Sequence, residues 1–95
     1  MTTLAADPNA RFLAAQFGQR IADLLNSPGK RALAVEAFDL VASSYWRKGD
    51  DVARNWMIGM CPPLGDRSPL DAIAAGDGDD VLAAARSEAR GDHAN

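Results

Sequence analysis

The sequence at residues 27–49 reads SPGKRALAVEAFDLVASSYWRKG, and it predicts the central element of the fold. Ser27-Pro28 is a typical helix start, because serine caps the first turn and proline at the first helical position loses no hydrogen bond. Apolar and small residues then recur at helical spacing on two adjoining faces: Leu33, Ala34, Ala37, Phe38, Leu40, Val41, Ser44 and Tyr45. So broad a stripe is typical of a helix packed on two sides. We expect this helix to end near Arg47-Lys48-Gly49, since cations and a left-handed glycine favour a helix C-terminus.

On the N-terminal side of this stretch, Asp7-Pro8 repeats the cap and proline signal. It predicts a helix that runs to about Asn26 and has one apolar face, formed by Leu13, Phe17, Ile21 and Leu24. Gly18 within this helix predicts a bend or a close neighbour.

On the C-terminal side, start signals predict three further helices. Asp50 or Asp51 caps the first of them, which reaches about Ile58 and contains Trp56 as a core anchor. Ser68-Pro69-Leu70-Asp71 has the spacing of a capping box and starts a short helix that stops at Gly76. Asp77 or Asp79 caps the last helix, which ends at Gly91. Two prolines and two glycines keep residues 59–67 out of regular structure.

These signals together predict an all-α protein with one small domain of about five helices. Residues 1–49 form an N-terminal segment of two helices, residues 50–91 form a second region, and residues 92–95 form a flexible tail.

The net charge of -3 argues against a dedicated nucleic-acid binder, because neutralising phosphates needs clustered cations. The first residues lack a signal peptide and no stretch is long enough for a membrane span, so we expect a cytoplasmic protein with no membrane partner.

No group of residues has the pattern of an enzyme site. Cys61 and His93 are the only residues of their kinds, whereas a nucleophile needs a base and a metal needs several ligands. The acidic residues Asp77, Asp79 and Asp80 are explained by a helix N-terminus, where carboxylates are favourable. We therefore expect no catalytic, cofactor-binding or metal site, no cofactor and no enzymatic activity.

From Trp56 onward the order of residues resembles a known family. Trp56-Met57, a proline-containing loop, Leu64-Gly65-Asp66-Arg67-Ser68-Pro69-Leu70-Asp71, Gly76-Asp77 and Val81-Leu82 follow one another at tight spacing. This order is similar to the toxin-binding domain of the Xre/MbcA/ParS family of bacterial antitoxins, over residues 50–91. Cys61 stands where the family often has Asn, and Asp66 where it often has a second Gly. Asp66 tolerates a positive φ better than most residues, so the loop can keep its shape.

The resemblance implies a partner, a RES-domain toxin that consumes NAD, and it implies a toxin-binding module of a toxin-antitoxin system. It also implies that residues 79–95 lie near the entrance of the toxin's cleft. Together with the loop chemistry, it gives a set of candidate partner-binding residues: Met57, Met60, Leu64, Arg67, Leu70, Arg86, Arg90, Asp92 and His93. For Arg67 two roles stay open, since it can bond the loop's carbonyls or reach a partner carboxylate.

Two other functions and a further partner stay open. Many family members have a helix-turn-helix, and residues 20–28 faintly resemble part of one, so a transcriptional autoregulator is an alternative. Its recognition segment, Lys30 to Phe38, offers only Lys30 and Arg31 for contact, which makes DNA binding doubtful. A phage-type adaptor for an unrelated host protein is a third hypothesis. Association of the chain with copies of itself also stays open.

Overall fold

The computed structural model describes residues 7–91, and this part of the chain is helical and contains no strand. Within it, six α-helices follow one another: α1 (Pro8–Phe17), α2 (Gln19–Leu24), α3 (Pro28–Ser43), α4 (Gly49–Ile58), α5 (Pro69–Ala74) and α6 (Gly78–Arg90). A 3-10 turn, η2 (Pro62–Leu64), lies between α4 and α5. The prediction of an all-α domain is confirmed. No helix in residues 7–91 is long and apolar enough to cross a lipid bilayer.

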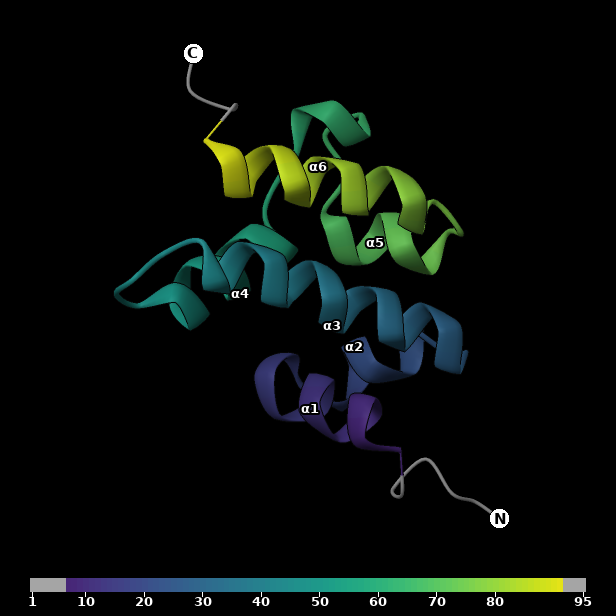
Figure 1. The fold of residues 1–95 in the computed structure, drawn as a ribbon. Coiled ribbons are helices and arrows are strands. Elements are labelled where there is room, and N and C mark those ends of the chain that lie inside the picture. The colour runs from purple at the N-terminus through teal and green to yellow at the C-terminus, as the bar shows by residue number, and fades with distance from the viewer. Residues whose placement is uncertain (1–6, 92–95) are drawn as a thin grey trace.

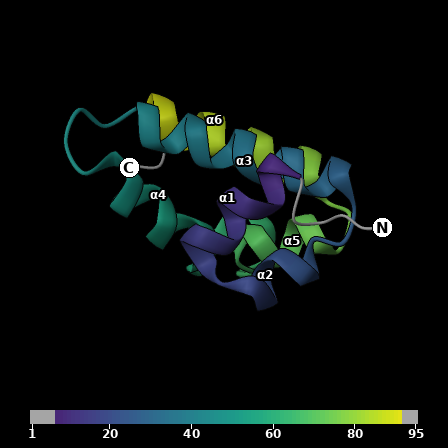
Figure 2. The ribbon, with the colours of Figure 1, turned by 90° about the horizontal axis from the view of Figure 1, so that it is seen from below.

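The central helix of the domain is α3, which contacts α1, α4, α5 and α6. Helices α1 and α2 lie on one side of it, and α5 and α6 lie on the other (Figures 1 and 2). Phe38 of α3 is buried and meets the rings of Phe12 and Phe17 edge to face, with centroid distances of 5.1 and 6.2 Å. The predicted two-sided packing is therefore confirmed. Tyr45 is an exception, because it lies beyond the end of α3 and is 36% exposed.

Three helices start at the caps that the sequence predicts. The side chains of Asp7, Ser27 and Ser68 accept hydrogen bonds from backbone N–H groups two or three residues on, at 2.9, 3.1 and 3.1 Å. Each cap is followed by a proline at the first helical position. These contacts satisfy N–H groups that a helix N-terminus otherwise leaves without partners.

Three predicted boundaries differ from the structure. Neither Asp50 nor Asp51 caps α4, because Lys48 is at the N-cap position and both aspartates lie in the first turn of the helix. Gly18 adopts a φ of 92° and ends α1, so the first predicted helix is two helices rather than one. Helix α3 ends at Ser43, and Lys48 rather than Gly49 is the left-handed residue, with a φ of 56°. Gly49 instead starts α4, where a Cβ atom would collide with the backbone carbonyl of Ala42. The glycine is thus needed for a close approach of two helices, a requirement that local sequence does not reveal.

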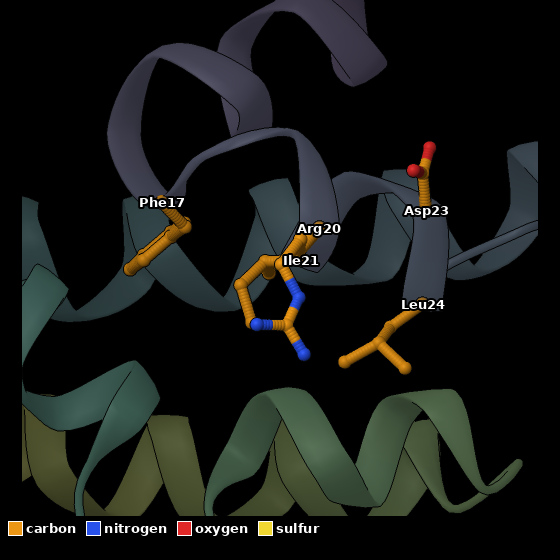
Figure 3. A pocket seen from close by; sticks show the side chains of 5 residues that line it. All are labelled: Phe17, Arg20, Ile21, Asp23 and Leu24. Atoms are coloured by element: carbon orange, nitrogen blue, oxygen red, sulfur yellow. The ribbon is translucent and has the colours of Figure 1, made fainter.

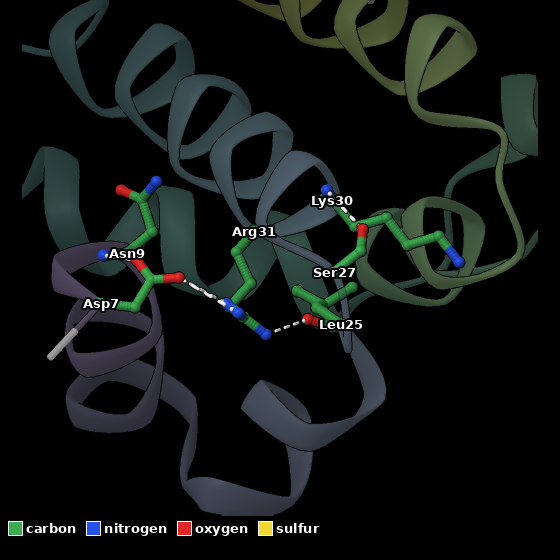
Figure 4. A network of polar contacts seen from close by, with 6 residues as sticks. All are labelled: Asp7, Asn9, Leu25, Ser27, Lys30 and Arg31. Atoms are coloured by element: carbon green, nitrogen blue, oxygen red, sulfur yellow. Dashed lines mark hydrogen bonds and ion pairs between the residues drawn. The ribbon is translucent and has the colours of Figure 1, made fainter. Parts of the chain in front are cut away.

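A buried arginine joins the first three helices (Figure 4). Arg31 of α3 is only 4% exposed, and its Nη1 donates to the backbone oxygen of Leu25 at 2.8 Å. Its Nε and Nη2 both lie 3.1 Å from Oδ2 of Asp7, the cap of α1. Burial alone raises the pKa of the Asp7 carboxyl. The hydrogen bonds from the Asn9 backbone and from Arg31 outweigh this effect, and the pKa lies below its ordinary value of 3.8.

The lowered pKa of Asp7 predicts a pH-dependent effect of the substitution Asp7→Asn. The ionised carboxylate stabilises the folded state above its unfolded pKa, and this contribution disappears as pH falls through the folded pKa. We expect Asp7→Asn to unfold at a lower urea concentration than the unaltered chain near pH 7. The gap should close as the pH falls well below 3.8. A gap of constant size across that range would contradict the ion pair.

Candidate functional site

The loop between α4 and α5 closes on itself through backbone hydrogen bonds. The N–H of Cys61 donates to the carbonyl of Arg67 at 3.2 Å, and the N–H of Asp66 returns to the carbonyl of Cys61 at 3.0 Å. Gly65 and Asp66 make the turn with φ values of 71° and 67°. The expectation that Asp66 can adopt a positive φ is confirmed, and the loop is a fixed part of the surface.

Arg67 fastens this loop to the start of α6. Its Nε donates to the carbonyl of Leu64 at 2.9 Å, and its Nη1 lies 2.8 Å from Oδ2 of Asp77. Asp77 occupies the N-cap position of α6, but its side chain makes no cap hydrogen bond and pairs with Arg67 instead. Of the two roles that the sequence left open for Arg67, the structure shows the bond to a loop carbonyl.

An apolar hollow of about 480 Å³ lies where α4, this loop and α6 meet. We call it the Met60 groove, and its lining residues are Trp56, Met60, Cys61, Pro62, Pro63, Ala84, Ser87 and Glu88. A smaller hollow of about 350 Å³ shares Pro63, Ala84 and Ser87 with it and continues along α6. Met60 is 75% exposed at its edge. An open apolar surface with a flexible thioether is typical of a site that adapts to a protein partner.

Three candidate partner-binding residues are in the core instead of on the surface. Met57, Leu64 and Leu70 are 0%, 3% and 2% exposed. Met57 falls on the inner face of α4, while Leu64 and Leu70 point under the loop and under α5 to complete the core cluster. A partner cannot contact them while the domain is folded, so we remove them from the proposed interface.

The remaining candidates divide by position. Met60 lines the groove, and Arg86 and Arg90 are exposed on α6, with Arg90 Nη2 3.4 Å from the hydroxyl of Ser87. Asp92 and His93 lie outside the described residues. Arg67 is also exposed, with a side chain that is 41% accessible, but it is paired with Asp77. Met60, Arg67, Arg86 and Arg90 are therefore the predicted residues that the structure leaves on the surface.

Of the residues that line the groove, the sequence-based candidates include only Met60. Trp56 was expected to be a core anchor, but it is only partly buried: it packs against the core cluster and also lines the groove. Ala84, Ser87 and Glu88 were missed because their contribution depends on how α6 lies against the loop. Helical spacing gives one usable signal, since Ala84 and Glu88 are one turn apart on a single face of α6.

Cys61 lines the groove but is only 5% exposed. Burial has the largest effect and raises the pKa of its thiol. A backbone hydrogen bond with Leu64 lowers the pKa by less than burial raises it, and the nearby carboxylates of Glu88 and Asp66 add smaller increases. A thiol with a raised pKa is protonated at neutral pH and is a poor nucleophile.

We therefore expect slow alkylation of Cys61 by iodoacetamide at pH 7.5, at least about tenfold slower than in the urea-unfolded chain. Mass spectrometry of timed samples measures both rates on the same protein. Equal rates in the folded and unfolded chain would show that the groove does not shield the thiol.

A second hollow lies elsewhere, beside α2 (Figure 3). It measures about 540 Å³ and is lined by Phe17, Arg20, Ile21, Asp23 and Leu24. Leu24 points toward α5 and is 50% exposed, while Asp23 points away (Figure 3). This hollow is more open to solvent than the Met60 groove and lies outside the region of family resemblance. We therefore consider this hollow a weaker candidate for the functional site than the Met60 groove.

The predicted recognition segment for DNA offers at most one cation, Lys30, for a phosphate. Arg31 is buried against Asp7, and Lys30 reaches toward α5, where its Nζ donates to the carbonyl of Ala74 at 2.8 Å (Figure 4). The exposed residues of α3 include Glu36 and Asp39, which repel a phosphate backbone. These contacts weigh against the autoregulator hypothesis.

Within residues 7–91, no three His, Cys, Asp or Glu side chains are grouped closely enough to hold a metal ion. Comparisons of the chain with protein-family models, curated proteins and solved structures found no match. The Met60 groove and the exposed face of α6 are thus the surfaces on which a functional proposal can be built.

Proposed function

We propose that this chain is a non-enzymatic antitoxin module that binds a RES-type, NAD-consuming toxin in the cytoplasm and obstructs its active-site cleft. The observation on which the proposal depends is the Met60 groove, where the loop of the antitoxin-like motif meets the closing helix α6. The loop of the motif is thus adjacent to α6, which belongs to the stretch that the resemblance puts near the entrance of the toxin's cleft.

The chemistry of the groove supports a protein rather than a small polar ligand. Its walls are formed largely by Trp56, Met60, Pro62 and Pro63, and a hydrophobic centre with an aromatic residue and methionine is typical of interface hot spots. Arg86, exposed on α6, can meet carboxylates at the rim of such an interface. We expect the apolar groove to supply most of the affinity and the arginines to supply orientation.

The proposal is tested by purifying the chain from its native cells and by inspecting the reading frames beside its gene. We expect an adjacent or overlapping frame to encode a RES-domain enzyme, and the same enzyme to co-purify in stoichiometric amount. If no such frame exists and no NAD-consuming enzyme co-purifies, the proposal is wrong. The adaptor hypothesis would then take its place, with whatever host protein is recovered as its partner.

A further inference from the structure

The loop between α3 and α4 presents an exposed tryptophan, Trp46. We call residues 44–48 the Trp46 loop. Trp46 is 92% exposed, and the guanidinium carbon of Arg47 lies 5.5 Å from the centre of its ring. An indole ring gains roughly 150–250 Å² of burial when it enters an apolar site. Burying this ring against a second surface would therefore be favourable.

The loop that bears this ring is held in a defined position. The hydroxyl of Ser44 donates to the carbonyl of Val41 at 2.7 Å, and the N–H of Tyr45 donates to the carbonyl of Ala42 at 3.3 Å. The hydroxyl of Tyr45 donates to Oε2 of Glu88 at 3.2 Å. Because Glu88 lines the Met60 groove, this last contact places the Trp46 loop directly beside the groove. The loop and the C-terminal end of α6 lie at the same end of the molecule (Figures 1 and 2).

The Trp46 loop projects from the surface whereas the Met60 groove is a hollow, and the charged groups of the two are opposite in sign. The loop offers a large aromatic ring flanked by the cations Arg47 and Lys48, and the groove offers apolar walls with the carboxylate of Glu88 among its lining groups. Trp46 does not fill the groove of its own chain, since it is 92% exposed. A projecting group and a receiving hollow that lie side by side form a self-complementary patch, as a twofold dimer interface requires.

We propose that the chain forms a reciprocal homodimer in which Trp46 of each copy enters the Met60 groove of the other. Arg47 of one copy then faces Glu88 of its partner, twice about the axis. Two exchanged tryptophans form the centre of a small interface, below the roughly 800 Å² per partner of a standard one. We expect a dissociation constant on the order of 10 μM. The inference does not depend on the identity of the toxin. It does imply that a toxin occupying the groove competes with dimerisation.

Sedimentation velocity of the full chain between about 1 μM and 1 mM tests the dimer directly. We expect a concentration-dependent shift from monomer to dimer, with a blue shift of tryptophan emission as Trp46 becomes buried. Trp46→Ala should weaken the dimer by at least about thirtyfold while leaving the melting temperature unchanged. The control is Leu24→Ala on α2, which removes a half-exposed apolar side chain far from the groove and should not alter the dimer. A chain that stays monomeric up to 1 mM, or a dimer indifferent to Trp46→Ala, overturns the proposal.

A charge exchange between two different chains tests the reciprocal pairing. Arg47→Glu or Glu88→Arg alone places like charges together at both contacts, so each variant should dimerise about tenfold more weakly. An equimolar mixture of the two variants restores opposite charges at both contacts and should form a heterodimer of nearly unaltered affinity. Tyr45→Phe controls for the hydrogen bond that Glu88→Arg also removes, and it should leave the dimer intact. A mixture no stronger than the single variants overturns the arrangement.

Discussion

Replacing Met60 by glutamate should weaken binding of the proposed toxin partner by about a hundredfold or more, without changing the stability of the free chain. Met60 is 75% exposed, so a charged side chain at this position can stay in water while the domain folds. In the complex, the same carboxylate would be desolvated among Trp56, Pro62 and Pro63, without a cation placed to meet it. Burying an unpaired charge at the centre of an interface is among the most costly substitutions that binding studies record.

The matched control for this substitution is Ile58→Glu. Ile58 is two residues away on the same segment, is 54% exposed and does not line the groove. Isothermal titration should give an affinity within about threefold of the unaltered chain for Ile58→Glu. Equal losses from both substitutions would mean that the partner covers α4 broadly. No loss from Met60→Glu would remove the groove from the interface.

Replacing Phe38 by alanine should have the largest effect on stability, a loss of about 3–5 kcal/mol. Phe38 is 2% exposed, and its ring packs edge to face against the rings of both Phe12 and Phe17. Removing it leaves a cavity between the α1–α2 pair and the rest of the domain. A domain of this size has about 5–14 kcal/mol of stability in total, so the variant should melt roughly 15 °C or more below the unaltered chain.

Phe38→Leu separates the cavity from the loss of aromatic contacts. Leucine refills most of the volume, so this variant should lose clearly less stability than Phe38→Ala in the same urea titration. A melting temperature of Phe38→Ala within a few degrees of the unaltered chain would contradict the central place of α3 in the core.

The helices could be predicted from the sequence because their start signals are local. Asp7-Pro8, Ser27-Pro28 and Ser68-Pro69 each combine a side-chain acceptor with a proline, and each starts a helix in the structure. The end of α3 could not be predicted in the same way. Where α3 and α4 approach each other, a Cβ atom on Gly49 would collide with the backbone of Ala42. The residue with a left-handed conformation is Lys48, one position earlier.

The candidate site was predictable only in part, because the sequence does not show which way side chains point. Met57 and Met60 looked alike as adaptable thioethers, yet one is fully buried and the other is 75% exposed. Leu64 and Leu70 frame the most distinctive motif of the chain, but they serve its core. A charged residue at either position would disrupt folding, so neither substitution can test the interface. Trp46 shows no helical periodicity and is identified only by its exposure.

If the reading frame beside this chain encodes the RES-domain enzyme that we propose as its partner, the NAD consumption of that enzyme is the measurement that tests the central claim most directly. The enzyme is titrated with the folded chain, with Met60→Glu in parallel. We predict that activity falls to background as the chain reaches one copy per active site, and that Met60→Glu leaves the enzyme active at the same concentrations. Unchanged NAD consumption in the presence of a large excess of the unaltered, folded chain would contradict the proposed function.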